Sequence, residues 1–375
     1  MKKILVSPLN WGLGHATRCI PVINELINNG ASVSIAGDGE SLRLLKQEFP
    51  QQTFFELPSY NITYSSGDSM VFKMLANFPK IRKAITAEHD ELKAIQNQNH
   101  FDIIIADNRY GMYHEETYNI FITHQINIQV PKHLKWLQPL LLNYNLKQIS
   151  NFKECWIPDF EGDENLSGDL SHNCKLPGNS YYIGALSRFG SSKPEVGSLK
   201  SDSDVPGSDF RLPTSHFNLL VILSGPEPQR TIFEKIIIAQ LKTSSQKTLI
   251  VQGLTNNFET KQLSENAWAV SYLTSETLFQ KIKEAELIIS RSGYSTIMDL
   301  AVCGKKAVLV PTPGQTEQEY LAEQFQEKNI FYSCKQPDFD LNDVIKKSET
   351  FDGLKLKNNG SMLSERIKVI LKNKL

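Results

Sequence analysis

Short apolar segments alternate with longer amphipathic segments along most of the chain. The apolar segments are nearly continuous runs of Ile, Leu, Val, Phe and Ala, which is typical of parallel strands buried on both faces. The segments between them have helical spacing. We therefore predict an α/β protein with two Rossmann-like domains, whose parallel sheets face each other across a cleft. The predicted strands are 4–9, 32–36, 54–57, 102–106, 119–123 and 155–158, then 219–223, 248–252, 267–272, 287–290, 307–310 and 330–333.

A polar segment separates the two sets of strands. Residues 187–215 are rich in Ser, Asp, Pro and Gly and contain few large apolar residues, as expected for an exposed linker. The chain of 375 residues is also longer than one hydrophobic core normally serves. We predict a first domain at 1–186, a linker at 187–215 and a second domain at 216–375, with the ligand site in the cleft at the carboxyl ends of the strands.

The segment 286–322 carries the most specific chemistry. Its apolar strand ends in a turn of small polar residues, and a helix then begins where its free N–H groups can face an anion. Asp299 follows about two helical turns later, and Gln318 and Glu319 lie on the next helix, after a Pro-Gly loop. This order offers a phosphate site, a carboxylate for vicinal hydroxyls and polar groups for a sugar.

This segment resembles the donor-binding signature of the MurG-type glycosyltransferases of family 28, which have the two-domain GT-B fold. The resemblance implies that Asp299 binds the ribose hydroxyls and that Gln318 and Glu319 contact the donor sugar. The family has Glu and a Gln-Gln pair at these places, so the identity of the sugar stays open. In this fold the last helix, here 361–371, tends to cross back to the first domain. The residues that the resemblance assigns to the diphosphate and the nucleotide are Arg291, Ser292, Gly293 and Tyr294.

A glycine-rich turn after the first strand supplies the candidate base. Gly12 and Gly14 let the backbone approach a ligand closely, and the helix that follows favours negative charge at its start. The family has a Gly-His loop here near the reacting centre, so the resemblance makes His15 the leading candidate for general base. Asp107, at the end of the fourth strand, is the alternative base.

The same turn is also a partial dinucleotide fingerprint. Thr17 stands in place of the third glycine, and Asp38 follows the second strand at about the distance of a ribose-binding carboxylate. An NAD-dependent oxidoreductase is therefore the alternative from another class, although it does not account for residues 290–319.

Several further polar residues follow strand ends and are candidates for the same cleft. Their assignments come from the family pattern, and ordinary turns or buried strand ends are the competing interpretations. The nucleotide-sugar candidates are Ser224, Gly225, Gln229, Arg230, Tyr272 and Leu273, and the acceptor-side candidates are Arg109 and His124.

Composition limits the remaining classes. A net charge of −1 argues against a nucleic-acid-binding protein driven by positive charge. Five scattered cysteines show no metal-binding spacing and indicate reduced thiols in a cytoplasmic protein. No Asp-x-Asp pair stands at a strand end, so neither a metal nor another cofactor is expected beyond the nucleotide sugar.

We therefore expect a metal-independent, inverting glycosyltransferase that moves a sugar from a UDP-linked donor to a hydroxyl of a glycan or lipid-linked acceptor, as in the synthesis of cell-envelope glycans or glycolipids. An epimerase or a non-catalytic sugar-nucleotide binder of the same fold remains an alternative. Two amphipathic stretches with basic and aromatic residues, 70–85 and 134–146, suit peripheral contact with the inner face of a membrane as well as packing on a core.

Overall fold

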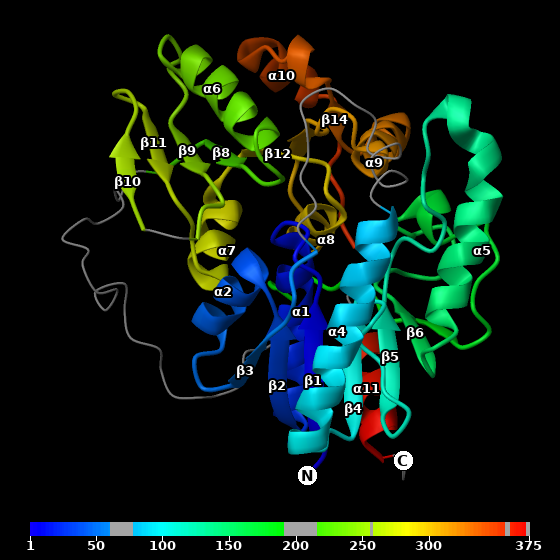
Figure 1. Cartoon of the computed structure of the whole chain (residues 1–375). Helices are drawn as coiled ribbons and strands as arrows, with labels where there is room; N and C mark the ends of the chain where they lie inside the picture. The colour runs from blue at the N-terminus through cyan, green and yellow to red at the C-terminus, as the bar shows by residue number, and fades with distance from the viewer. Residues whose placement is uncertain (61–77, 191–215, 256–257, 357–360, 373–375) are drawn as a thin grey trace.

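The computed structural model describes residues 1–60, 78–190, 216–255, 258–356 and 361–372. It consists of two α/β domains, each built on a seven-stranded sheet, with the second domain above the first in Figure 1. Residues 70–77 of the predicted amphipathic stretch 70–85 and residues 191–215 of the predicted linker lie outside the described residues. The domain boundaries therefore stay predictions.

The first sheet is entirely parallel, with the strand order β3-β2-β1-β4-β5-β6-β7. Its central strands are buried on both faces, because their side chains are almost all apolar. The strands are β1 (Lys3–Pro8), β2 (Ser32–Gly37), β3 (Thr53–Glu56), β4 (Ile103–Asp107), β5 (Tyr118–Ile122), β6 (Glu154–Ile157) and β7 (Ser180–Tyr182). The helices of this part of the chain are α1 (Gly14–Asn28), α2 (Gly39–Glu48), α4 (Phe78–Asn99), η1 (Lys132–Leu137), α5 (Gln138–Ile149) and η2 (Gly168–Leu170).

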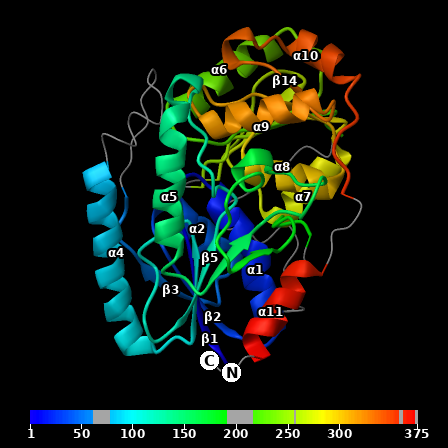
Figure 2. The same ribbon diagram turned by 90° about the vertical axis from the view of Figure 1, so that its right-hand side faces the viewer.

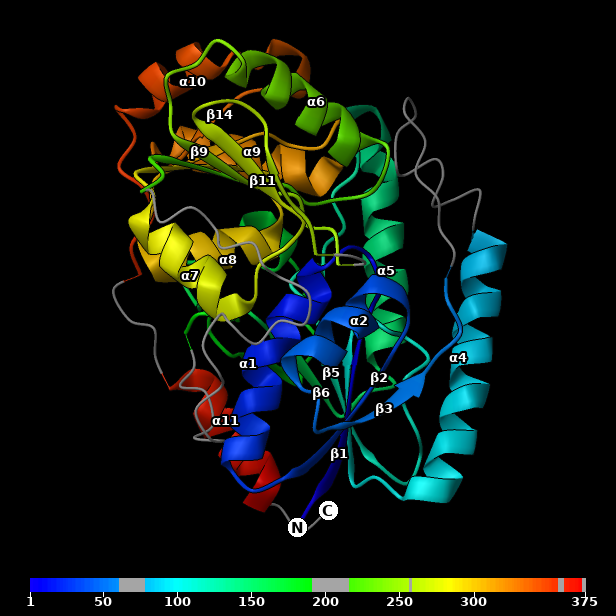
Figure 3. The same cartoon turned by 90° about the vertical axis from the view of Figure 1, so that its left-hand side faces the viewer.

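Helices cover both faces of the first sheet. Figures 2 and 3 show α4 and α5 on one face and α1 on the other, with the last helix, α11 (Met362–Lys372), beside α1. Arg366 of α11 ion-pairs with Glu154 of β6 and lies over the ring of Tyr181 at 3.5 Å. The last described helix therefore packs on the first domain, although its sequence follows the second.

The second sheet has the order β10-β11-β9-β8-β12-β13-β14 and is parallel except for the β10–β11 pair. Its strands are β8 (Leu219–Ile222), β9 (Thr248–Val251), β10 (Thr260–Gln262), β11 (Ala267–Val270), β12 (Leu287–Ser290), β13 (Ala307–Leu309) and β14 (Tyr332–Ser333). Its helices are α6 (Gln229–Leu241), α7 (Ser275–Glu284), α8 (Tyr294–Cys303), α9 (Thr316–Glu327), η4 (Gln336–Asp338) and α10 (Leu341–Ser348).

The predicted fold class is confirmed, and each of the twelve predicted strands appears within a few residues of its expected place. The sequence did not predict the two outer strands β7 and β10. Each has only three residues, with partly or fully exposed side chains, so neither carries the apolar run that marks a buried strand.

Candidate active site

Helix α1 begins directly after the glycine-rich turn that ends β1. Gly12 has a φ of 75°, a left-handed conformation that glycine adopts without steric cost. Within the first helical turn, the hydroxyl of Thr17 donates to the carbonyl of Gly14 at 3.0 Å. His15 thus lies in the first turn of α1, at the carboxyl edge of the first sheet.

The imidazole of His15 faces a carboxylate on the neighbouring strand β4. Nδ1 of His15 is 2.8 Å from Oδ1 of Asp107, which is fully buried. Nδ1 of His15 also lies 2.9 Å from Nη2 of Arg18, which only donates, whereas the carboxylate of Asp107 only accepts. Because the hydrogen bond to the ionised carboxylate is the shorter contact, we assign the proton of His15 to Nδ1, and Nε2 is then the acceptor. Burial, followed by the charge of Arg18, lowers the pKa of His15 below its ordinary value. His15 is therefore neutral at pH 7, the form that a general base requires.

Arg18 lies one helical turn after His15 and is 1% exposed. It donates to both carboxylate oxygens of Asp107 through Nε and Nη2. Although burial opposes ionisation, Arg18 and His15 hold the pKa of Asp107 well below its usual range. Asp107 is thus ionised, enclosed and paired, which corrects its prediction as an alternative base: its position lets it orient His15 instead.

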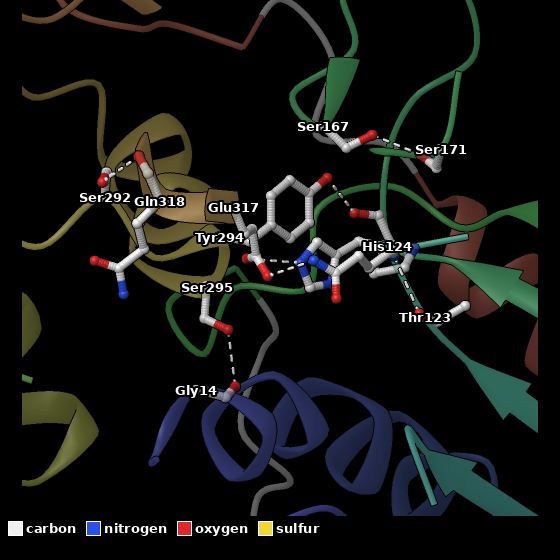
Figure 4. Close-up of polar contacts among 12 residues, drawn as sticks. Gly14, Thr123, His124, Ser167, Ser171, Ser292, Tyr294, Ser295, Glu317 and Gln318 are labelled. Carbon is white, nitrogen blue, oxygen red and sulfur yellow. Dashed lines mark hydrogen bonds and ion pairs between the residues drawn. The ribbon is translucent and has the colours of Figure 1, made fainter. Parts of the chain in front are cut away.

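His124, which follows β5, links this cluster to the second domain. Arg18 donates to Nδ1 of His124 at 2.7 Å, so the proton of His124 is on Nε2, which lies 3.0 Å from Oε1 of Glu317 in α9. The ring of His124 also stacks on that of Tyr294 at 4.2 Å between centroids (Figure 4). The predicted acceptor-side residue His124 therefore lies at a contact between the domains.

The first turn of α8 faces the first turn of α1 across the cleft. The hydroxyl of Ser295 donates to the carbonyl of Gly14 at 2.8 Å (Figure 4), and a Cβ added to Gly14 would lie 3.1 Å from that hydroxyl oxygen. Gly293 precedes α8 without a side chain to cap its N–H groups. Two helix N-termini with partial positive charge thus converge on one place, as a diphosphate requires.

Asp299 lies in the second turn of α8 and is buried. Its carboxylate accepts a hydrogen bond from the hydroxyl of Ser187 at 2.7 Å and one from Nε of Arg188 at 3.3 Å. Burial raises the pKa of Asp299, and the charge of Arg188 opposes this shift. Its role toward a ribose stays a prediction, and a ribose would have to share this carboxylate with the start of the linker.

Arg291 does not present its guanidinium to the cleft. It is 1% exposed and donates to the carbonyls of Val310, Pro311 and Gln229 and to the side chain of Gln336. Burial lowers the pKa of Arg291 to about 10. The predicted contact of this side chain with the diphosphate is therefore corrected: Arg291 fastens the turn before α8 to the loops around it.

Two other arginine residues that were predicted to contact the substrates also form ion pairs within the protein. Arg230 ion-pairs with Glu227 at 2.7 Å and with Glu234 at 3.1 Å. Arg109 is fully buried and pairs with Asp38 and Glu88, so it does not reach an acceptor. The pairing of Arg109 corrects its prediction and also occupies Asp38, the carboxylate that a dinucleotide site would need. The role of Arg230 toward a nucleotide sugar stays a prediction.

The remaining candidates lie on the second domain, in its helices or in the loops that follow its strands. Gln318 accepts from the N–H of Thr312 through its side chain at 2.8 Å, and its carbonyl accepts from the hydroxyl of Ser292 at 2.7 Å (Figure 4). Glu319 is exposed and accepts from the N–H of Gly314 at 3.1 Å. The side chain of Gln229 accepts from Gln336 at 3.0 Å. Ser224, Gly225 and Tyr272 are partly exposed, and Leu273 is buried.

Sequence reasoning missed Arg18, Arg188 and Glu317. Arg18 could have been found, because a residue three positions after His15 on a helix shares its face. Arg188 and Glu317 lack such a local signal, since their partners come from segments more than a hundred residues away.

Two findings bear on cofactors and membranes. Within the described ranges, no group of three or more His, Cys, Asp or Glu side chains is arranged to hold a metal ion. None of the helices that the structure describes is long and apolar enough to cross a bilayer.

Comparison with known proteins agrees with this architecture. Residues 216–372 match the model of the glycosyltransferase family 28 C-terminal domain. An uncharacterized glycosyltransferase of Methanosarcina acetivorans is 22% identical over 338 residues, covering 84% of this chain and 81% of that protein. The crystal structure of MurG from Acinetobacter baumannii superposes with a TM-score of 0.51 at 14% identity, covering 98% of this chain and 94% of that one.

A third match is short but more specific. The UDP-N-acetylglucosamine–N-acetylmuramyl-(pentapeptide) pyrophosphoryl-undecaprenol N-acetylglucosamine transferase of Streptococcus pneumoniae is 30% identical over 101 residues, which is 26% of this chain and 28% of that protein. The fold and these matches define the chain as a glycosyltransferase with the GT-B fold. Residues 216–372 match the family 28 C-terminal domain, and the chain is similar to MurG-type enzymes, which confirms the predicted resemblance.

Proposed function

We propose that the protein transfers a sugar from a UDP-sugar to an acceptor hydroxyl, with inversion at the anomeric carbon and His15 as the general base. The observation that carries this proposal is the neutral imidazole of His15, which lies in the first turn of α1, is hydrogen-bonded to the ionised carboxylate of Asp107 and lies opposite the N-terminus of α8. The choice of UDP is supported by the similarity to the Streptococcus transferase, which uses UDP-N-acetylglucosamine.

In this mechanism the acceptor hydroxyl lies against Nε2 of His15, which takes its proton as the acceptor oxygen attacks the anomeric carbon. The bond from that carbon to the diphosphate oxygen breaks, and the electron pair leaves with the diphosphate. Backbone N–H groups at the start of α8 and α1 face the departing charge. The Asp107 carboxylate stabilises the imidazolium that forms.

Calorimetric titration with UDP, GDP, TDP and NAD, followed by transfer assays, tests this proposal. We expect UDP to bind the wild type and His15→Ala equally, while His15→Ala lowers turnover roughly 100-fold. His114→Ala, which changes a histidine in the loop before β5, is the matched control. Binding of NAD alone, or full turnover in His15→Ala, contradicts the proposal.

We also propose that the acceptor is lipid-linked and is reached at a membrane surface. Trp136 in η1 and Leu140 in α5 are 69% and 62% exposed, and Lys132 and Lys135 beside them are exposed cations. An apolar patch flanked by basic residues suits an anionic bilayer. The preceding segment leads directly to the cleft, where the carbonyl of Gln129 accepts from the hydroxyl of Thr316 at 2.9 Å.

Co-sedimentation with vesicles of phosphatidylglycerol and phosphatidylcholine tests the membrane contact. The double variant Trp136→Ala/Leu140→Ala is expected to bind such vesicles about ten-fold more weakly than the wild type. Ile232→Ala removes an exposed apolar side chain on α6 and is the control. Equal binding of all three proteins excludes this surface.

A further inference from the structure

Glu317 is placed so that one carboxylate of the second domain reaches two side chains of the first. Its Oε1 lies 3.0 Å from Nε2 of His124, and its Oε2 accepts from Nε2 of Gln125 at 3.0 Å (Figure 4). The Glu317 side chain is 26% exposed. Both contacts join the second domain to the first, so they would be lost if the domains moved apart.

Glu317 also brings a negative charge to the cluster around the base. Burial opposes its ionisation, but His124, His15 and Arg18 hold the pKa of Glu317 below its ordinary value, so it is charged at pH 7. Arg18 and Asp107 carry opposite charges, and Glu317 adds a second negative charge to the cluster.

We propose that Glu317 is a positioning residue that couples closure of the cleft to the proton affinity of His15. Arg18 disfavours a proton on His15, and the arriving Glu317 carboxylate counteracts part of that effect. His15 then becomes a stronger base at the stage when both substrates are enclosed. The inference rests on the proposed role of His15 as the base.

Other groups near Glu317 also influence the pKa of His15. They come from four elements of the two domains: His15 and Arg18 from α1, Asp107 from β4, His124 and Gln125 after β5, and Tyr294 from α8. Three other hydrogen bonds join the domains in this described region, from Ser295 to Gly14, from Thr316 to Gln129 and from Tyr294 to Pro158, and all three join neutral groups. Glu317 is therefore the group on the second domain whose removal changes the charge at the base.

The test follows the titration of the His15 ring by NMR in the full-length protein without substrate. Glu317→Gln preserves the shape and the acceptor oxygen but removes the charge, and we expect the His15 midpoint to fall by about half a pH unit or more. Glu323→Gln, an exposed carboxylate on the same helix, is the control and should leave the midpoint unchanged. Glu317→Asp keeps the charge and should stay near the wild-type midpoint.

A double variant that exchanges the charge provides the second part of the test. In Gln125→Glu/Glu317→Gln the charge moves to the first domain, while the bond across the cleft can re-form with donor and acceptor exchanged. We expect the His15 midpoint to return toward the wild-type value, which a merely structural role for Glu317 does not predict. An unchanged midpoint in Glu317→Gln, or no recovery in the double variant, overturns the proposal.

Transfer assays separate this proposal from the proposed function. The acid limb of kcat/KM should move with the NMR midpoint in each variant. If no UDP-sugar is turned over by the wild type, the proposed function fails, whereas the NMR titration still decides whether Glu317 acts on His15.

Discussion

Burial and the Arg18 guanidinium lower the pKa of His15, whereas the Asp107 carboxylate raises it, and the balance lies below the ordinary value of 6.5. The active form of a base is the deprotonated one. Acidification therefore removes activity only after the pH has fallen below that ordinary value.

We accordingly expect kcat/KM for sugar transfer to be level near pH 7 and to fall on the acid side with a midpoint below 6.5. Asp107→Asn removes a negative charge beside the ring, so it should shift this midpoint lower and reduce the plateau roughly 10-fold or more, since the ring loses its orienting partner. A pH–rate profile of both proteins checks this. A wild-type midpoint above pH 7 would mean that another group limits the reaction.

At the scale of elements, the sequence predicted the strands and the helix starts well, but it did not predict which groups the arginine side chains contact. An apolar run between polar turns is a local signal, and so is a glycine turn before a helix. The partner of a guanidinium is not local. Arg291 donates to groups that lie 19 to 62 positions away, so its neighbours depend on how the loops pack and not on the Arg-Ser-Gly sequence.

The same reason explains which part of the candidate site could be foreseen. The glycine turn placed His15, and the end of β4 placed Asp107, because parallel strands bring their carboxyl ends to one edge. Glu317 was missed, because only the closed arrangement of the domains brings it to His124.

Arg291→Met separates the two roles of that residue. Four buried acceptors lose their donor, so we expect the free energy of unfolding to fall by roughly 3 to 5 kcal/mol. Arg43→Met, at a side chain 51% exposed, should change it by less than about 0.5 kcal/mol. Chemical denaturation measures both. If stability were unchanged and UDP binding were weaker, the result would support the direct phosphate contact that the sequence predicted.

At the scale of the whole molecule, η2 and the residues directly before it fit closely against α9. The N–H of Asp169 donates to the hydroxyl of Tyr320 at 2.7 Å, and the Gln324 side chain donates to the carbonyl of Leu166 at 3.3 Å. Gly168 lies between them with a φ of 53°, and an added Cβ would overlap the side chains of Tyr320 and Gln324.

Gly168→Ala should therefore displace the ends of the Tyr320 and Gln324 side chains and break their hydrogen bonds to the first domain. We expect this loss to weaken the contact between the domains, to raise KM for the donor several-fold and to lower stability by roughly 1 to 3 kcal/mol. Gly162→Ala is the matched control, because its φ is 84° but no atom lies within 4 Å of an added Cβ. Gly162→Ala should therefore lower the free energy of unfolding only by the cost of the backbone strain, about 1 kcal/mol. Urea denaturation and donor kinetics check the pair, and equal effects in the two variants would exclude the steric contact with α9.

The return of α11 to the first domain makes the second domain, in connectivity, an insertion between two pieces of the first. The first domain is complete only when the last described helix has been synthesised, whereas the second can form its sheet as soon as α10 is made. During synthesis the later domain can thus finish first. A chain that ends before α11 would keep an intact second domain, but the face of α1 that α11 covers would be exposed to water. Early termination should therefore yield aggregation and not a partly active enzyme.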